Sequence, residues 1–354
     1  MRHHIVVRPA LVVVPLLVLL AESAVAQPRT LDIYWIDVEG GAATLVVSPS
    51  GESLLYDAGW EVDGRDGRRI ADVVHQIGLK KIDYFVMSHY HPDHAGGIPV
   101  LAKLVPIGHC FDRGDFVEPA NQKWRDLYMA ACASKRTIVK AGDTIPLKGV
   151  QVDVVASNGQ LLAKPINGGG ATNPLCPSAE SKPAEGPENQ YMVGSLFTFG
   201  KFTFLDLADL DWQKEMELAC PTNRLGQVTI YQAGRHGALD GAGAPGFLYA
   251  IKPRVVIVNN GPRKGLGGPS AGSPKPLTKH YERLAKVPGI EGIWQGHLSL
   301  LESDKASNTS EEMIANLEDS AVCKGHWIRA SVKSDGSFTI TNSRNRFSKS
   351  YTAR

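Results

Sequence analysis

Short runs of apolar residues recur along the chain and predict a mixed α/β fold. Runs rich in β-branched, aromatic and aliphatic residues, bounded by glycine, proline, asparagine or serine, are typical of strands. We interpret as strands the runs 31–36, 43–47, 53–56, 84–87, 150–155, 191–199, 202–207, 228–231, 255–258, 327–332 and 337–341. Apolar residues at helical spacing predict helices in 69–78, 212–218 and 279–286.

These elements fall into two groups, and each group combines strands with helices. That order predicts a four-layer αββα sandwich of the α/β class, in which two sheets pack face to face and helices cover both outer faces. Residues 157–187 are rich in glycine, proline and asparagine and form too long a stretch for an ordinary connection. We interpret them as an insert, either a flap or disordered, in a single domain spanning residues 27–354.

Residues 1–26 have the pattern of a secretory signal peptide. An unbroken apolar run, 10–21, follows two arginines, and Ala24 and Ala26 frame a cleavage site before Gln27. As a helix this run spans about 18 Å, well short of the roughly 30 Å hydrocarbon core of a bilayer. We therefore expect cleavage near Ala26, export to the periplasm or the medium, and no stable membrane anchor.

Composition narrows the functional classes. The chain has 354 residues, and 38 lysines and arginines nearly balance 36 aspartates and glutamates. The net charge of +2 offers no broad basic surface for nucleic acid or an anionic membrane. None of the five cysteines lies in a C-x-x-C pair, which argues against a zinc ribbon or a thioredoxin-type site. In an oxidising compartment we expect one or two disulfides and a leftover thiol.

One segment carries the strongest chemical signal. The predicted strand 84–87 leads into the sequence SHYHPDH, which places three histidines and an aspartate within six positions. His89 and His91 alternate by two, so on an extended segment both project the same way. Asp93 and His94 follow where the chain turns, which provides ligands for a second, adjacent centre. Imidazole and carboxylate together suit zinc, with manganese and iron as alternatives.

This motif resembles the signature of the metallo-β-lactamase superfamily. Upstream, the segment LLYDAG places Asp57 where the superfamily has an aspartate that supports the metal loop. Downstream, Asp209 stands where an aspartate bridges both metals, and His236 stands at the place of the last ligand. The resemblance covers about residues 31–300 and implies two divalent metal ions, expected to be zinc. The implied ligands are His89, His91, Asp93, His94, Asp209 and His236.

Within the superfamily, the chain is more similar to the extracytoplasmic hydrolase domain of bacterial competence DNA-uptake channel proteins. The segments IDVEGGA (36–42), ENQ (188–190) and RHG (235–237) carry this likeness. Two positions depart from the pattern. The usual third histidine of the first metal site is absent, and its place falls near Asn189, which we expect to support the site. Arg235 replaces the first histidine of the usual His-His-Gly turn and either contacts substrate or faces solvent.

The predicted activity is that of an exported metal-dependent hydrolase. Two ions roughly 3.5–4 Å apart can share a hydroxide that attacks a carbonyl or phosphoryl centre. Asp93, besides binding metal, can orient this nucleophile or pass a proton to the leaving group. Neutral overall charge favours a small ester, lactone, amide or phosphoester as the substrate. His297 and Asn260 are further candidates for substrate contact, and Arg263 and Lys264 follow Asn260 in a glycine-rich loop.

Two other functions remain open. The competence-type resemblance suggests a phosphodiesterase or nuclease, which the lack of a basic stripe makes less favoured. The missing third histidine suggests a non-catalytic binding protein on a degraded site. The superfamily fixes the chemistry much better than the substrate.

Overall fold

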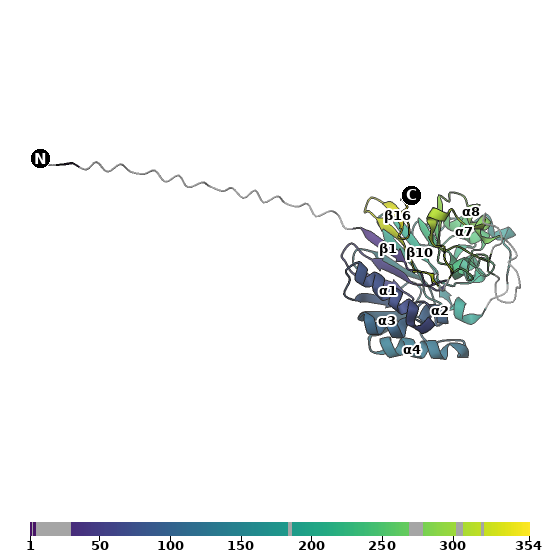
Figure 1. Cartoon of the computed structure of the whole chain (residues 1–354). Helices are drawn as coiled ribbons and strands as arrows, with labels where there is room; N and C mark the ends of the chain where they lie inside the picture. The colour runs from purple at the N-terminus through teal and green to yellow at the C-terminus, as the bar shows by residue number, and fades with distance from the viewer. Residues whose placement is uncertain (2, 5–29, 183–185, 269–278, 302–306, 320–321) are drawn as a thin grey trace.

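Two β-sheets pack face to face, and helices cover the outer face of each (Figure 1). The computed structural model describes residues 1, 3–4, 30–182, 186–268, 279–301, 307–319 and 322–354. The predicted signal peptide, 1–26, lies almost entirely outside the described residues. Among the described residues, no helix has the length and apolar character needed to cross a bilayer. The layered arrangement confirms the predicted αββα sandwich.

The first sheet combines the N-terminal strands with the last three strands of the chain. Its order is β17-β16-β15-β1-β2-β3-β4-β5-β6. Neighbouring strands are antiparallel from β17 to β3 and parallel from β3 to β6. The strands are β1 (Leu31–Trp35), β2 (Thr44–Val47), β3 (Ser53–Tyr56), β4 (Ile82–Val86), β5 (Ile107–Asp112), β6 (Arg136–Ile138), β15 (Ile328–Val332), β16 (Ser337–Asn342) and β17 (Ser348–Thr352).

The second sheet comes from the middle of the chain. Its order is β14-β13-β12-β11-β10-β9-β7-β8, with parallel pairs from β10 to β14. The strands are β7 (Gln151–Ser157), β8 (Gln160–Leu161), β9 (Gly194–Phe199), β10 (Phe202–Asp206), β11 (Ile230–Gln232), β12 (Val255–Val258), β13 (Gly292–His297) and β14 (Ile314–Asn316).

Each sheet has its own layer of helices. Apolar side chains of α1, α3 and α4 pack on the first sheet, and those of α6, α7 and α8 pack on the second. Figure 1 shows α1, α3 and α4 on one side of the molecule and α7 and α8 on the other. The α-helices are α1 (Arg65–Gln76), α2 (Pro92–Ala95), α3 (Ile98–Leu104), α4 (Gln122–Cys132), α5 (Pro187–Gln190), α6 (Trp212–Ala219), α7 (Pro245–Ile251) and α8 (His280–Ala285). Short 3-10 turns are η1 (Val62–Gly64), η2 (Pro119–Asn121), η3 (Ala133–Lys135), η4 (Cys176–Ser178), η5 (Gly234–Gly237) and η7 (Glu311–Met313).

The central core lies between the sheets and joins the two halves of the chain. The rings of Trp35 on β1 and Phe204 on β10 meet edge to face, with their centroids 5.4 Å apart. Both residues are buried together with the inward side chains of neighbouring strands in both sheets. At one end of this interface, Thr44 Oγ1 donates a hydrogen bond of 2.9 Å to Gln232 Oε1, which joins β2 to β11. The sheets are therefore fixed relative to each other close to the predicted metal segment.

The described part of the insert 157–187 is packed against the second half of the chain, so the alternative of a disordered insert does not hold for these residues, and the alternative of a functional flap stays a prediction. Main-chain bonds tie Ile166 to Arg224 and Gly170 to Asn223. A disulfide joins Cys176 of the insert to Cys220. A second disulfide joins Cys110 to Cys132, and Cys323 is the free thiol, so all five cysteines are accounted for.

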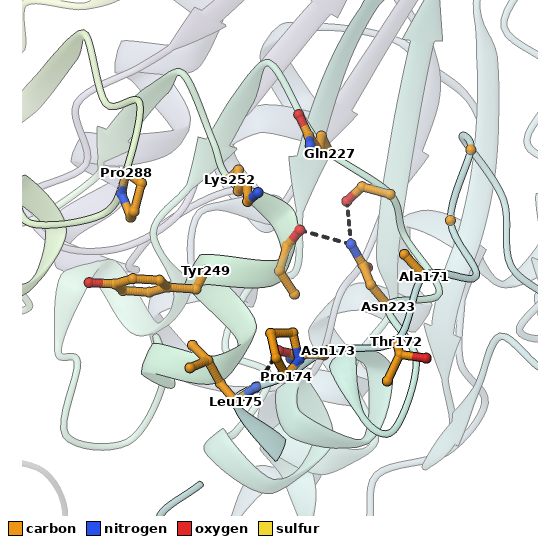
Figure 2. A pocket seen from close by; sticks show the side chains of 14 residues that line it. Ala171, Thr172, Asn173, Pro174, Leu175, Asn223, Gln227, Tyr249, Lys252 and Pro288 are labelled. Atoms are coloured by element: carbon orange, nitrogen blue, oxygen red, sulfur yellow. Dashed lines mark hydrogen bonds between the residues drawn. The ribbon is translucent and has the colours of Figure 1, made fainter. Parts of the chain in front are cut away.

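A cavity of about 430 Å³ lies where the insert meets α7 (Figure 2). Tyr249, Lys252 and Leu175 contribute to its wall. The buried amide of Asn223 donates to the carbonyls of Gly226 and Ala250 at 2.9 and 2.8 Å. Its lining contains none of the predicted metal ligands. This cavity is therefore separate from the predicted metal centre.

Candidate metal centre

The predicted ligands lie beyond the carboxyl ends of parallel strands. β3 leads to Asp57, β4 leads to the motif segment, β10 leads to Asp209 and β11 leads to His236. Parallel strands bring their carboxyl ends to one edge of a sheet, and this edge is where ligands bind in open α/β sheets. The contact between β2 and β11 holds the two edges side by side. Residues far apart in the sequence thus converge on one site.

Two groups of potential ligand atoms share one aspartate. His89, His91 and Asp209 form the first group, and within it every pair of ligand atoms lies within 4.8 Å. The same limit holds for the second group, Asp93, His94, Asp209 and His236. Asp209 belongs to both groups, as expected of a bridging carboxylate. The structure therefore brings together all six predicted ligands.

In the first group, one ring nitrogen of each histidine points toward the other. His89 Nε2 lies 3.0 Å from His91 Nδ1. The outer nitrogen of His91 lies 3.5 Å from the carboxylate of Glu118, whose role the sequence did not suggest. A carboxylate on the far nitrogen of a histidine is the common arrangement behind metal-binding histidines, because it fixes the ring's tautomer. Glu118 thus supports the use of Nδ1 of His91 toward a metal.

Asp57 organises the motif from behind. Its carboxylate accepts bonds from Ser88 N at 2.8 Å, from Ser88 Oγ at 2.6 Å and from His94 Nδ1 at 2.7 Å. Since the Ser88 hydroxyl donates to Asp57, it accepts from His89 Nδ1, 2.9 Å away. This network assigns the proton of both histidines to Nδ1. In this tautomer Nε2 of each ring faces the predicted metal positions. For His94, burial lowers the pKa, but the carboxylates of Asp57, Asp209 and Asp93 outweigh it and raise the pKa well above its ordinary value, so a bound cation would take the place of the proton on Nε2.

The buried atoms at the centre fit a divalent cation. His94 Nε2, Asp209 Oδ1 and His236 Nε2 are buried and have no hydrogen-bond partner. His94 Nε2 lies 3.4 Å from Asp209 Oδ1, and His236 Nε2 lies 3.3 Å from the same oxygen. Buried polar atoms without partners are costly, and a cation would satisfy these lone pairs together. Nitrogen and carboxylate oxygen are also the donors that zinc, manganese and iron accept.

The charges of the site favour ionised carboxylates. Burial raises the pKa of Asp209, but the nearby His236 and His94 outweigh it and hold the pKa well below its ordinary value. Lys264 and His94 do the same for the pKa of Asp93. Burial and the neighbouring histidines lower the pKa of His89 well below its ordinary value, so this ring is neutral. Ionised carboxylates and neutral imidazole are the forms that bind metal.

Helix α5 places Asn189 beside the motif. Its neighbour Glu188 accepts a bond from Tyr90 N, between His89 and His91, at 3.1 Å. The side chain of Asn189 is 4% exposed, and its Oδ1 has no hydrogen-bond partner. A buried carbonyl oxygen of this kind is free to contact a cation. The supporting position that the sequence suggested for Asn189 is compatible with this geometry.

The turn that carries His236 has an unusual backbone. Arg235 and His236 adopt φ values of 52° and 58°, which L residues with side chains rarely occupy. Arg235 N donates to Ala208 O at 3.1 Å, and Gly234 N donates to the hydroxyl of Tyr231 at 2.9 Å. Strained residues persist where surrounding contacts enforce them, and they cluster at functional sites. The turn aims His236 at Asp93 Oδ2, 3.1 Å away. Arg235 lies half-buried on the same turn.

His297 and Asn260 belong to neither of the two ligand groups. His297 is fully buried, and its Nε2 lies 2.9 Å from Asp37 and 3.7 Å from Cys323 Sγ. The buried amide of Asn260 donates to His297 O at 2.9 Å. The Asn260 amide and His297 Nε2 are thus engaged in internal contacts, whereas His297 Nδ1 is buried without a hydrogen-bond partner, and the substrate contacts expected of both residues stay predictions. Arg69 pairs with Asp37 at 3.2 Å and so balances the negative charge of the carboxylate that contacts His297.

Sequence reasoning missed the contact of one lysine. Lys264 Nζ is bonded to the carboxylate of Asp93, although 171 positions separate them. The sequence placed Lys264 only in a glycine-rich loop that follows a strand. The position of Lys264 after the strand β12 could have indicated this contact. Because β12 is parallel to β11, the loop that follows β12 reaches the sheet edge that carries His236.

Two comparisons with known proteins match this chain. Residues 36–161 match the family model described as the metallo-beta-lactamase superfamily. Recombination protein 2 of Haemophilus influenzae is 22% identical over 234 residues, which cover 66% of this chain and 24% of that protein. The chain thus spans about a quarter of that relative's length. Together, the two matches support the recognition made from the motif.

Solved structures share part of the fold. The metallo-beta-lactamase fold protein YhfI from Bacillus subtilis is 13% identical, with a TM-score of 0.44, over 75% of this chain and 95% of its own. CmlA, a diiron beta-hydroxylase from Streptomyces venezuelae, is 13% identical, with a TM-score of 0.39, over 65% of this chain and 44% of its own. Overlaps of this extent carry no information on function.

Proposed function

We propose that this protein is a metal-dependent hydrolase that cleaves a small ester, lactone, amide or phosphoester in an exported compartment, because residues 36–161 match the metallo-beta-lactamase superfamily model and the predicted ligands converge. The observation that carries the proposal is the pair of ligand groups sharing Asp209. The shared aspartate supports a two-metal centre with zinc as the expected metal. Serine or cysteine nucleophiles have no part in this proposal.

The chain's own residues divide the work. When bound, a pair of divalent cations lowers the pKa of a water molecule and polarises the bond to be cleaved. His89, His91 and Asp209 would hold one ion, and Asp93, His94, Asp209 and His236 would hold the other. Asp57 and Ser88 keep two of the histidines in the tautomer that can bind. Asp93 is ionised, so it can take a proton from the attacking water and pass it to the leaving group.

Export is supported by two features of the chain. The pattern of residues 1–26 is that of a signal peptide. The two disulfides are of the kind that form and persist in oxidising compartments. We therefore place the mature enzyme in the periplasm or the medium.

A phosphodiesterase or nuclease is the second candidate. The similarity to Recombination protein 2 supports it, and so does the cationic Lys264 at the centre. The overall charge of +2 counts against extended nucleic acid as the substrate. A small phosphodiester is compatible with both observations. A salt-dependent DNase assay separates the two candidates.

The first test is a metal count on the mature protein and matched variants. We expect close to two ions per chain by elemental mass spectrometry, and turnover of at least one ester, lactone or phosphodiester in a panel. Asp209→Ala should lose both ions and activity, whereas His91→Ala should lose chiefly the first. Asp112→Asn serves as the control. Asp112 is a buried carboxylate that pairs with Arg136, and the variant should keep both ions. Full turnover in both ligand variants would overturn the site, and bound metal without any turnover would favour a binding protein.

A further inference from the structure

Lys264 is the partly exposed cation of the metal centre. Its side chain is 37% exposed, whereas that of its partner Asp93 is 6% exposed. The ammonium group also lies 4.4 Å from the ring centroid of Trp60, within range of a cation–π interaction. Lys264 thus reaches from solvent to a predicted metal ligand. An incoming substrate would meet this charge.

Close packing of glycines fixes the turn that carries Lys264. Gly261 N donates to Lys264 O at 2.9 Å and closes the turn. A Cβ atom on Gly40 would lie 2.9 Å from both Gly261 N and Lys264 Cβ, so position 40 has no room for a side chain. On the other side, a Cβ on Gly265 would collide with the main chain of His236. The turn is held between two parts of the site, and the base of Lys264 is therefore fixed.

The neighbouring arginine does not share this position. Arg263 has a 60% exposed side chain and pairs with Asp319 at 2.5 Å. Lys264 pairs with Asp93, a residue whose carboxylate a metal ion would also engage. Once that carboxylate binds a cation, the charge of the ammonium group is no longer matched by Asp93 alone. The site would then hold a positive group suited to an anion.

We propose that Lys264 binds a negatively charged oxygen of the substrate beside the scissile bond. The substrate class is therefore oxyanion-bearing: a phosphoester, or an ester that carries a carboxylate. The aromatic face of Trp60 keeps the ammonium group over the site. This inference rests on the proposed hydrolase function and specifies its substrate. Lys264 acts as a specificity-determining residue, and the metal ligands are unchanged.

The test compares charged and neutral substrates in the metal-loaded enzyme. The substrates are bis(4-nitrophenyl) phosphate, 4-nitrophenyl hemisuccinate and neutral 4-nitrophenyl butyrate. In Lys264→Met, we expect the ratio of kcat/KM for a charged substrate to that for the neutral ester to fall about 10- to 100-fold, chiefly through KM. Lys264→Arg should restore much of the ratio. Whether the phosphodiester or the hemisuccinate shows the larger fall identifies the type of oxyanion.

Two further measurements keep the result decisive. Competitive inhibition by inorganic phosphate should weaken by a similar factor in Lys264→Met, and the metal content should stay close to two ions. Arg263→Met, which removes a charge one position away, should leave the substrate ratio within about twofold. An unchanged ratio and unchanged phosphate inhibition in Lys264→Met would overturn the proposal, as would equal losses on all substrates. Failure of the wild-type enzyme to cleave any substrate would instead overturn the proposed function.

Discussion

Asp57 shows how one carboxylate prepares the ligands without binding metal itself. Its Oδ2 accepts from both Ser88 Oγ and His94 Nδ1. In Asp57→Asn, the side-chain NH2 group would take the place of Oδ2. It would face the two donors Ser88 Oγ and His94 Nδ1 and could accept a hydrogen bond from neither. His94 would then have to carry its proton on Nε2, the atom that faces the predicted metal. We expect affinity for the second ion to fall about 10- to 100-fold while the fold is retained.

Titration with zinc against a chelating indicator measures this effect. Asp112→Asn removes an equally buried charge that contacts Tyr128 and Arg136 instead, so it should reduce stability and leave zinc affinity unchanged. Ser88→Ala should affect the first ion more than Asp57→Asn does, because Ser88 Oγ contacts His89 Nδ1. Unchanged affinity for the second ion in Asp57→Asn would show that Asp57 has no part in orienting His94.

The spacing of residues alone revealed only the ligands that share a local motif, whereas Asp57, Asp209 and His236 were found through the family resemblance. His89, His91, Asp93 and His94 lie within one short segment, so their spacing alone predicts convergence. The environment of His297 depends on Asp37 and Cys323, which come from remote parts of the chain. Its burial therefore could not be predicted from spacing. The contact of Lys264 with Asp93 is missed for the same reason.

At the scale of elements, helix α6 supports the turn that carries His236. Glu215 on α6 accepts a bond of 3.0 Å from the hydroxyl of Tyr231 on β11. That hydroxyl accepts from Gly234 N, which begins the turn η5. The other oxygen of Glu215 accepts from Ala244 N at 3.1 Å. Burial raises the pKa of Glu215 from 4.5 to about 8, against the lowering effect of these hydrogen bonds.

A raised pKa in the folded state makes stability depend on pH. The contribution of Glu215 to stability is complete below pH 4.5, falls as the pH rises, and is lost above about 8. Glu215→Gln cannot titrate. Relative to this variant, we expect the wild-type free energy of unfolding to fall by on the order of 2–4 kcal/mol over that interval. Urea unfolding at several pH values, with metal held constant, measures the difference. Parallel curves for the two proteins would contradict the expectation.

Strands and helices with a clear periodic spacing of apolar residues were predicted from the sequence. Elements whose bounds depend on tertiary contacts were not. The strands β3 and β12 match the predicted runs 53–56 and 255–258. Residues 191–193 were predicted as part of a strand, but β9 begins at Gly194. The reason is that Val193 N bonds to Ser88 O and so joins the motif segment instead of the sheet. Sequence periodicity did not identify the strands β5, β6, β8, β13, β14 and β17 or the helices α2, α3, α4, α5 and α7.

At the scale of the whole molecule, the two sheets meet through the metal centre. The first sheet supplies His89, His91, Asp93 and His94, and the second supplies Asp209 and His236. The order of elements predicted the two layers, but nothing local in the sequence fixes which edges meet. That registration depends on long-range contacts such as Trp35 with Phe204. The centre therefore joins the loops of two sheets, one built from both ends of the chain and one from its middle.

Metal removal should consequently destabilise the entire fold. Binding to the native state alone adds about 2.7 kcal/mol for each site when free metal is at 100 times its dissociation constant. Without a cation, the buried lone pairs of His94, Asp209 and His236 also lose their shared partner. We expect chelation to lower the thermal midpoint by several degrees and zinc to restore it. Asp209→Ala should show a low midpoint that neither treatment changes. If chelated and zinc-loaded wild type unfold at the same temperature, metal binding at this centre is not coupled to folding.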